Sequence, residues 1–183
     1  MRPWISDLAN SPGAVAHPKS RGNLVRPGGV LYGLCDDVLP QTIPLPELKP
    51  VMSLYSAIAL IKPVKKGSSL GYGRTFVTRR DSVIGTIPIG YQDGYMRGFS
   101  NKAEVIVNGC RAPVVGRVSM DWTIVDLTDV PDAKKGTPVT LMGSDGSEEV
   151  TASELGSLAD TISYEITCGV SRRVRRVFVD SAE

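Results

Sequence analysis

Glycine and tyrosine are concentrated in four short stretches of this 183-residue chain, and tyrosine is a side chain that can take up and release a proton. The stretches are Gly71-Tyr72-Gly73, Gly90 to Arg97, Gly116 to Asp121, and Tyr164-Glu165. Glycine weakens a strand and is usually kept where the backbone must approach another group closely, so the flanking glycines predict that the Tyr72 side chain is presented rather than packed. Taken singly, each stretch is better explained by a strand end or a turn. The four together favour a functional site.

A change of composition near residue 47 divides the chain into two expected regions. Residues 1–46 are rich in proline and glycine and contain one short apolar run, Val30 to Tyr32, so this region cannot bury a core by itself. From Pro50 onward, alternating and β-branched runs separated by turn residues predict a mainly antiparallel β domain over residues 47–183. The expected strands lie at Val51 to Ile61, Val83 to Ile89, Glu104 to Val107, Thr123 to Leu127, and Val139 to Met142.

Two hairpins and one helix are also expected in the β domain. Asn108-Gly109 lies between two apolar runs, and both residues tolerate the positive φ values of a type I′ turn. Ser144-Asp145-Gly146 predicts a second hairpin. Thr151 can cap a helix that ends near residue 160, with the Glu154 carboxylate reaching back to the N–H of the cap residue.

The charged residues do not point to an anionic partner. Lys and Arg number 21 against 19 Asp and Glu, a formal net charge of +2, so we expect neither a nucleic-acid surface nor a membrane surface. Four arginines near the C-terminus alternate with valines, which predicts a strand with a solvated face rather than an anion site. They are Arg172, Arg173, Arg175 and Arg176.

The possible metal ligands and thiols are few and scattered. His17 is the single histidine, and the three cysteines contain no CxxC pair, so neither a zinc site nor a disulfide framework is expected. The N-terminal residues do not have the pattern of a secretion signal, and no run of about 18 apolar residues occurs. We therefore expect a cytoplasmic protein without a metal. The cysteines are Cys35, Cys110 and Cys168.

The order and spacing of seven motifs resemble the alanine racemase family, specifically its C-terminal β domain and the end of its pyridoxal-phosphate-binding (β/α)₈ barrel. The motifs are ANS at 9–11, RPG and LYG within 26–33, LKPVMSL at 48–54, GYG at 71–73, IPIGYQDGYMR at 87–97, VGRVSMD at 115–121, and ISYEI at 162–166. The resemblance implies that residues 1–46 are a remnant of the barrel. It also implies a homodimeric isomerase that interconverts L- and D-alanine, a precursor of peptidoglycan, with active sites shared across the dimer.

The resemblance also assigns roles to individual residues. Tyr72 resembles the base that acts on one face of the substrate α-carbon in the partner's active site; the alternative is a buried tyrosine at a strand end. Met120 and Asp121 resemble the pair whose backbone amides bind the substrate carboxylate, although Met120 could instead be core filler. The expected lining of the substrate entrance consists of Tyr91, Arg97, Arg117, Ile162 and Tyr164.

The cofactor would be bound mainly by residues of the first region. Ser11, Gly28 and Gly29 resemble the phosphate-binding residues, and Tyr164 also touches the phosphate in the family. Arg26 resembles the arginine that donates to the pyridine nitrogen and so leaves the ring uncharged. Without the resemblance, Arg26 would be interpreted as a surface arginine beside a turn. Asp7 stands where the family commonly has a histidine, so either it pairs with Arg26 or residues 1–8 leave the family register.

No lysine of the chain lies in a context like that of the family's cofactor lysine. We therefore expect this chain to be inactive alone and to act as part of a longer racemase. The alternative is a free-standing β domain that dimerises or binds a partner without catalysis. Tyr91 and Tyr164 would narrow the entrance and favour alanine over serine. The lysines are Lys19, Lys49, Lys62, Lys65, Lys66, Lys102, Lys134 and Lys135.

Overall fold

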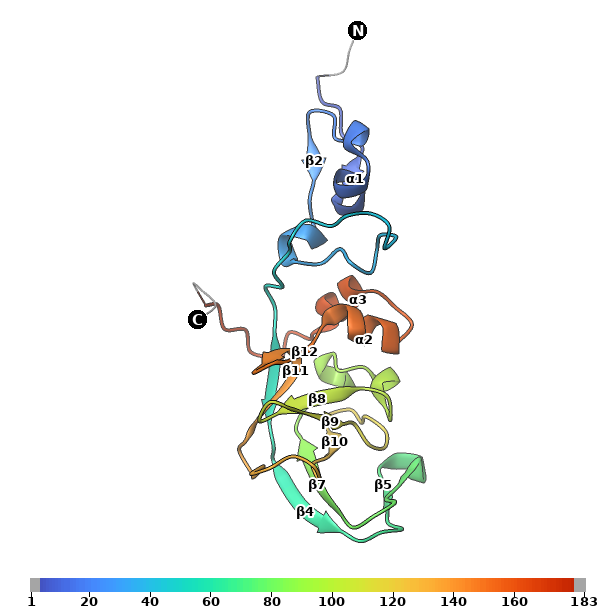
Figure 1. The fold of residues 1–183 in the computed structure, drawn as a ribbon, viewed down its shortest axis with the longest axis vertical. Coiled ribbons are helices and arrows are strands. Elements are labelled where there is room, and N and C mark those ends of the chain that lie inside the picture. Colours follow the sequence, from blue (N-terminus) through green and yellow to red (C-terminus); the bar gives the residue numbers. More distant parts are fainter. Residues whose placement is uncertain (1–3, 180–183) are drawn as a thin grey trace.

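A computed structural model describes residues 4–179, and these form an elongated molecule with a slender N-terminal segment at one end and a β domain at the other (Figure 1). The N-terminal segment contains β1 (Ala9–Asn10), α1 (Ser11–Ala16), η1 (Pro18–Ser20), β2 (Val25–Arg26) and η2 (Gly29–Tyr32). Strands β1 and β2 pair in parallel, with α1 between them in the sequence. The Asn10 side chain caps α1 by accepting a hydrogen bond from the Gly13 N–H.

The β domain contains two main antiparallel sheets, which confirms the predicted fold class. One has the order β10-β7-β4, and the other has the order β12-β11-β8-β9 with β3 also paired to β11. Their strands are β3 (Leu54–Ala57), β4 (Leu60–Val64), β7 (Ser82–Ile87), β8 (Glu104–Val107), β9 (Cys110–Pro113), β10 (Thr123–Asp126), β11 (Pro138–Asp145) and β12 (Glu148–Val150). A separate hairpin of β5 (Ser69–Leu70) and β6 (Phe76–Val77) lies at the far end of the domain.

The predicted strand from Val51 to Ile61 is wrong in one respect, because the chain forms two strands there. Strand β3 pairs with β11 and β4 pairs with β7, so the chain passes from one sheet to the other at Ile58-Ala59. Ile58 is 1% exposed at this crossing. A continuous run of apolar residues does not reveal such a crossing, because both halves have the same composition.

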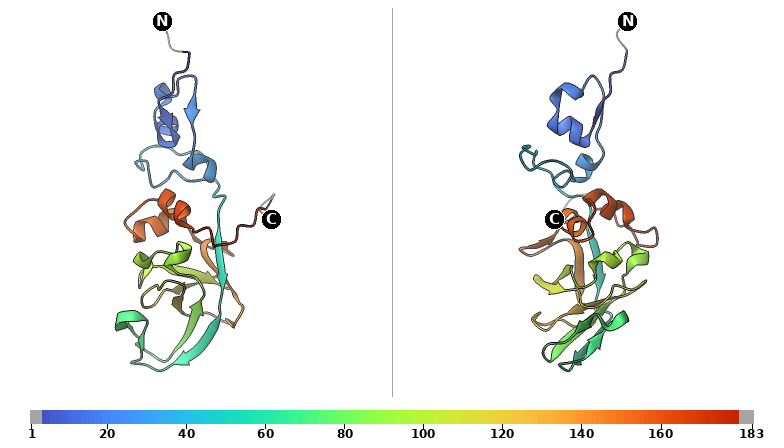
Figure 2. Two further views of the ribbon diagram at one scale, coloured as in Figure 1. Left: turned by 180° about the vertical axis from the view of Figure 1, so that it is seen from behind. Right: turned by 90° about the vertical axis from the view of Figure 1, so that its right-hand side faces the viewer.

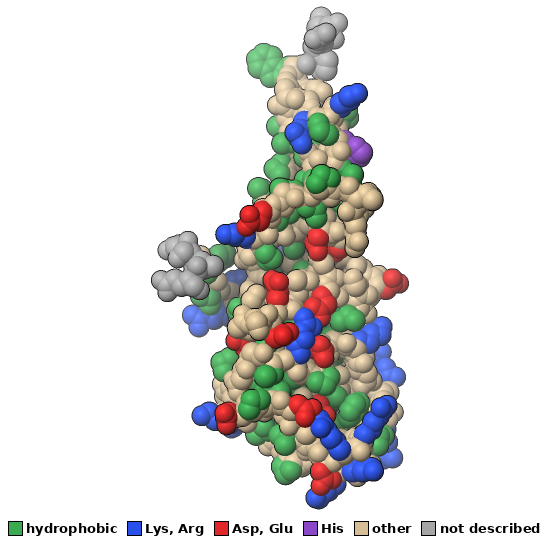
Figure 3. Space-filling model, in the orientation of Figure 1, with side chains coloured by type: hydrophobic (Ala, Val, Ile, Leu, Met, Phe, Trp, Pro, Cys, Tyr) green, Lys and Arg blue, Asp and Glu red, His purple; other side chains and the backbone are tan. Residues whose placement is uncertain are grey.

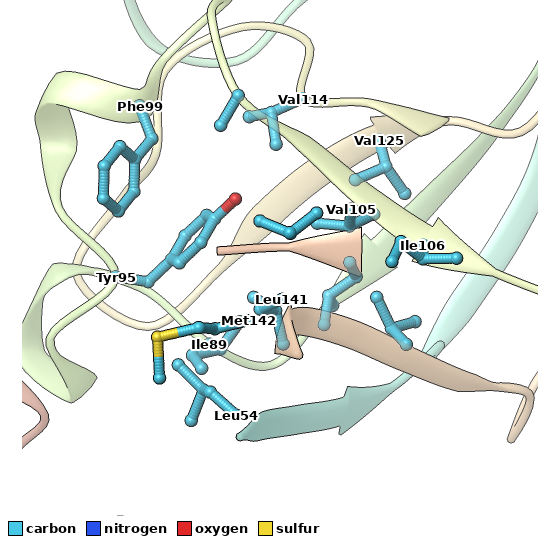
Figure 4. Close-up of a cluster of buried hydrophobic side chains, with 14 of the residues drawn as sticks. Leu54, Ile89, Tyr95, Phe99, Val105, Ile106, Val114, Val125, Leu141 and Met142 are labelled. Atoms are coloured by element: carbon cyan, nitrogen blue, oxygen red, sulfur yellow. The ribbon is translucent and has the colours of Figure 1, made fainter. Parts of the chain in front are cut away.

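The inward-facing side chains of both sheets form the main core, drawn in Figure 4. Val105, Val125 and Leu141 are fully buried in it. Tyr95 and Phe99 pack against each other at the edge of the cluster, with ring centroids 4.8 Å apart and an interplanar angle of 56°. This tilted arrangement is one that aromatic pairs prefer.

Both predicted hairpins are confirmed. Asn108 and Gly109 join β8 to β9 with φ values of 52° and 70°, as a type I′ turn requires. Strands β11 and β12 form the second hairpin, in which Asp145 pairs with Glu148. Its turn therefore lies one residue later than the sequence indicated.

Two short helices, α2 (Ala152–Leu158) and α3 (Ser163–Gly169), lie between the sheets and the N-terminal segment in all three views (Figures 1 and 2). The Thr151 hydroxyl accepts a hydrogen bond from the Glu154 N–H at 3.0 Å, which confirms the predicted cap of α2. The expected reciprocal bond from the Glu154 carboxylate is wrong, because that carboxylate binds Arg111 instead. Helix α3 was not predicted.

The predicted strand at the C-terminus is also wrong. The described residues after Val170 form turns and irregular chain. Arg176 donates hydrogen bonds to the carbonyl groups of Val170, Ser171 and Val174, and this curls the segment on itself. Side-chain bonds to nearby carbonyls compete with the ladder that a strand would need.

Candidate functional site

The Tyr72 side chain is presented to solvent, as its flanking glycines predicted. It lies in η3 (Tyr72–Arg74), the turn between β5 and β6, and is 74% exposed. Gly71 and Gly73 both have φ of 70°, a conformation that favours glycine. A Cβ on Gly71 would lie 3.2 Å from the backbone N of Arg117, so the turn packs closely on the next motif. The interpretation of Tyr72 as a buried strand-end residue is therefore wrong.

An open pocket of about 320 Å³ lies beside this tyrosine. Arg117 brings a permanent positive charge to the pocket wall, and Trp122, 47% exposed, adds a large aromatic surface. Trp122 was not predicted as a site residue, although it directly follows Met120-Asp121 in the sequence. The full lining is Gly71, Tyr72, Thr86, Arg117, Ser119, Trp122 and Ile124.

The turn that carries Met120 and Asp121 is joined to the turn of η4 (Tyr91–Asp93). The N–H of Tyr91 donates to the Ser119 carbonyl and the N–H of Gln92 donates to the Met120 carbonyl, both at 3.0 Å. Met120 is 51% exposed, so its interpretation as core filler is wrong. Backbone contact this close is possible because residue 90 is glycine, where a Cβ would lie 2.2 Å from the Ser119 oxygen.

Arg173, in the segment that follows α3, forms ion pairs with both of these turns. Its guanidinium bonds to Asp93 at 2.6 and 3.0 Å and to Asp121 at 2.5 Å, so the expectation that this arginine only faces solvent is wrong. Burial opposes ionisation of Asp93, but the hydrogen bonds from Arg173 and the Gly90 N–H, with the charge of Arg173, outweigh it and hold the pKa of Asp93 below its usual range. No role of Asp93 was predicted from the sequence.

A second group of predicted residues meets at the junction of the N-terminal segment and α3. The buried Ser11 hydroxyl accepts hydrogen bonds from the N–H groups of Gly28 and Val30 at 2.7 and 3.4 Å. Tyr164 lies so close to Gly29 that a Cβ there would be 2.2 Å from the ring. The Tyr164 hydroxyl donates a hydrogen bond to the Leu34 carbonyl at 3.5 Å. We call Ser11, Gly28, Gly29 and Tyr164 the hydroxyl cluster.

Burial is the largest cause that raises the pKa of the Tyr164 phenol, and the nearby Asp37 carboxylate acts in the same direction, so the hydroxyl stays protonated at neutral pH. A protonated phenol, a serine hydroxyl and backbone amides are the donors that suit a phosphate group. The glycine at position 29 lets the Tyr164 ring approach the backbone, where a Cβ would overlap it. The hydroxyl cluster therefore fits the phosphate of the expected cofactor.

Arg26 pairs with Asp7, with 2.7 Å between Nε and Oδ2, so the carboxylate does take the place beside the arginine. The Arg26 side chain remains 61% exposed. Of the remaining entrance residues, Ile162 immediately precedes α3, and Arg97 is exposed on η5 (Arg97–Phe99), which packs against α2.

The hydroxyl cluster and the Tyr72 pocket are not brought together within one chain. The first lies at the junction of the N-terminal segment, and the second lies at the opposite end of the β domain in every view (Figures 1 and 2). Within residues 4–179, no group of His, Cys, Asp and Glu side chains could hold a metal ion. The same residues contain no helix long and apolar enough to cross a membrane.

The fold therefore defines a class of protein: a β domain with an exposed tyrosine at one end and, at the other, hydrogen-bond donors that suit a phosphate. Comparison with known proteins agrees with this class. The family model for the alanine racemase C-terminal domain matches residues 51–178. An alanine racemase from Symbiobacterium thermophilum is 43% identical over 97% of this chain and 47% of its own length. The chain therefore belongs to the alanine racemase family and spans about half the length of the curated relatives it matches.

Solved structures of the family share the fold. The alanine racemase from Streptomyces coelicolor A3(2) superposes with a TM-score of 0.89 at 35% identity and covers 99% of this chain and 47% of that one. The alanine racemase from Bartonella henselae, whose crystal structure has covalently bound pyridoxal phosphate, superposes with a TM-score of 0.83 at 34% identity over 93% of this chain and 46% of that one.

Proposed function

We propose that this chain is the C-terminal part of a pyridoxal-phosphate-dependent alanine racemase in which Tyr72 acts as a base across a homodimer. The observation that carries the proposal is the separation of two groups that each match a role in such a site. Tyr72 is exposed at one end of the chain, and the hydroxyl cluster lies at the other. A second copy of the chain would bring a Tyr72 to the cluster of the first.

The N-terminal segment supports the proposal that residues 1–46 belong to a larger barrel. Its two parallel strands are joined through a helix, which is the connection that parallel barrels use. Large apolar side chains are exposed on it, including Trp4 at 91% and Leu8 at 77%. Figure 3 shows hydrophobic side chains spread along this segment, whereas charges of both signs are interspersed over the β domain. A missing barrel wall would cover such side chains.

The proposed site assigns a task to each of these residues. Ser11, Gly28 and Tyr164 would bind the cofactor phosphate, and Arg26 would donate to the pyridine nitrogen. When bound, the cofactor supplies the electron sink that makes the substrate α-proton removable. Tyr72 would take or return that proton on one face of the α-carbon.

The substrate would be held by the joined turns at the other end. The backbone amides of Met120 and Asp121 would bind the substrate carboxylate, and both turns are braced by the hydrogen bonds described above. Tyr91 and Tyr164 would narrow the entrance, which favours a side chain as small as that of alanine. A lysine on a preceding barrel would act on the opposite face, so the chain alone would be inactive.

Replacing Tyr72 with Phe, in the enzyme assembled from this chain and a lysine-bearing barrel, tests the proposal. The ring stays and the ionisable oxygen is lost, so kcat should fall by about 10² to 10⁴. Exchange of the α-proton with solvent should be lost from L-alanine and should partly persist from D-alanine through the lysine.

Tyr55→Phe is the matched control, because Tyr55 is similarly exposed (57%) but lies on β3, outside the Tyr72 pocket. It should leave both exchange rates unchanged. If Tyr72→Phe slows the exchange of both enantiomers only slightly, or if it abolishes cofactor binding, Tyr72 is a structural residue. A binding domain without catalysis would then be the better interpretation.

A further inference from the structure

Asp37 caps helix α3 from a loop that lies 126 residues earlier in the chain. Its Oδ1 accepts a hydrogen bond from the Ser163 hydroxyl at 2.8 Å, and its Oδ2 accepts one from the Ser163 N–H at 2.5 Å. Ser163 is fully buried, and Ile162, the residue before the helix, has no side-chain acceptor. Asp37 thus does for α3 what an N-cap side chain usually does, and its negative charge is favourable at a helix N-terminus.

The adjacent carboxylate has a parallel contact with a different helix. Asp36 Oδ1 accepts a hydrogen bond from the Ser153 hydroxyl, in the first turn of α2, at 2.7 Å. Two consecutive residues therefore attach the same loop to both C-terminal helices. Of the two, only Asp37 binds the residue next to Tyr164, and this makes Asp36 a matched control.

The cap sets the place of the Tyr164 phenol. Tyr164 directly follows the capped Ser163, its ring lies against Gly29, and its hydroxyl donates to the Leu34 carbonyl at 3.5 Å. Without the cap the first turn of α3 would fray, because its first N–H groups have no partner within the helix. Fraying of this turn would carry the phenol out of the hydroxyl cluster.

We propose that Asp37 is a positioning residue, which caps α3 and so keeps the Tyr164 hydroxyl in the hydroxyl cluster for binding of a phosphorylated cofactor. The inference rests on the function proposed above. The charge of Asp37 by itself would change the affinity in the opposite direction, because a carboxylate near the hydroxyl cluster repels a phosphate. Removal of the carboxylate would then strengthen binding, whereas loss of positioning weakens it.

The test measures affinity for pyridoxine 5′-phosphate, which has no aldehyde and cannot attach to a lysine. The protein is the enzyme assembled from this chain and a lysine-bearing barrel. Tyr164→Phe and Asp37→Ala should each raise Kd by about tenfold to a hundredfold, because each costs one hydrogen bond to a charged group. Asp36→Ala should change Kd by less than about twofold, because α2 does not carry the phenol.

Two further variants separate positioning from a general loss of structure. Asp37→Asn should bind within about twofold of the parent, because asparagine keeps an acceptor for the Ser163 N–H and gains a donor for its hydroxyl. Asp37→Ala added to Tyr164→Phe should weaken binding by less than about twofold more, since the group that Asp37 positions is already absent. Amide hydrogen exchange in α3 should be faster in Asp37→Ala than in Asp36→Ala.

The inference is overturned if Asp37→Ala binds as tightly as the parent, if Asp36→Ala weakens binding equally, or if the double variant shows additive losses. If Ser11→Ala and Tyr164→Phe also leave Kd unchanged, the phosphate site of the proposed function fails together with the inference. If Asp37→Ala does not fold, Ser163→Ala replaces it in the test, because it removes one of the two hydrogen bonds to Asp37. A Kd that is unchanged in Ser163→Ala would then overturn the inference.

Discussion

Replacing Arg111 with Met would remove a charge that joins β9 to three other elements of the β domain. Arg111 lies on β9, and its side chain is 30% exposed. It forms a forked pair with Glu154 at 2.8 and 3.1 Å, binds Glu148 at 2.9 Å and Glu104 at 3.3 Å, and donates to the carbonyl of Glu149. These contacts connect the sheet to the first turn of α2, which packs against α3.

The expected cost of Arg111→Met follows from this geometry. The side chains of the three carboxylate partners are 32% to 42% exposed, so these ion pairs are only partly buried. The energy of each pair should therefore lie between that of an exposed pair, up to ~1 kcal/mol, and the ~3 to 5 kcal/mol that breaking a buried pair costs. We assign ~1 kcal/mol to each of the two shorter pairs, a few tenths to the third, and ~1 kcal/mol to the carbonyl bond. Methionine keeps the apolar stem, so the free energy of unfolding should fall by about 3 kcal/mol, or about 6 to 12 °C in Tm.

Urea denaturation and thermal unfolding followed by circular dichroism would measure this loss. The difference from the parent should shrink in 0.5 M salt, a condition we choose because it screens both the lost attraction and the repulsion among the remaining carboxylates. Arg80→Met is the control, since the Arg80 pair with Asp129 is exposed on both sides, and its unfolding midpoint should not change. A loss below about 1 kcal/mol, or a difference that grows with salt, would refute the reasoning.

Two further changes test the site. The folded-state pKa of Asp93 lies below its usual range, so its ionisation stabilises the fold at neutral pH. This contribution is lost as the pH falls through that pKa. The difference in unfolding midpoint between the parent and Asp93→Asn should therefore be largest near pH 7 and should disappear as the pH falls below about 4. A wider difference in acid would contradict the assigned role of Arg173 as its partner. Gly29→Ala should displace the Tyr164 ring and weaken pyridoxine 5′-phosphate binding. Gly169→Ala, at the far end of α3, would place its Cβ 3.9 Å from the nearest atom and should bind normally in the same titration.

Those parts of the structure that depend on neighbouring residues could be predicted from the sequence. The Asn108-Gly109 hairpin and the Thr151 cap are local, because the turn geometry and the capping hydroxyl act within four residues. The exposure of Tyr72 has the same origin, since the two adjacent glycines determine the backbone of its turn.

The remaining features depend on contacts between residues far apart in the sequence, and only the tertiary structure decided them. Helix α3 has no capping side chain of its own and receives Asp37 from 126 residues away, so no local signal marked its start. Arg173 resembled a solvated strand residue until the fold brought Asp93, 80 residues earlier, within 2.6 Å. The fold also separates Tyr72 from the hydroxyl cluster, because β5 and β6 lie at the far end of the β domain. The order of motifs along the sequence carries no distances, so it cannot show that one chain holds the two halves of the proposed site apart.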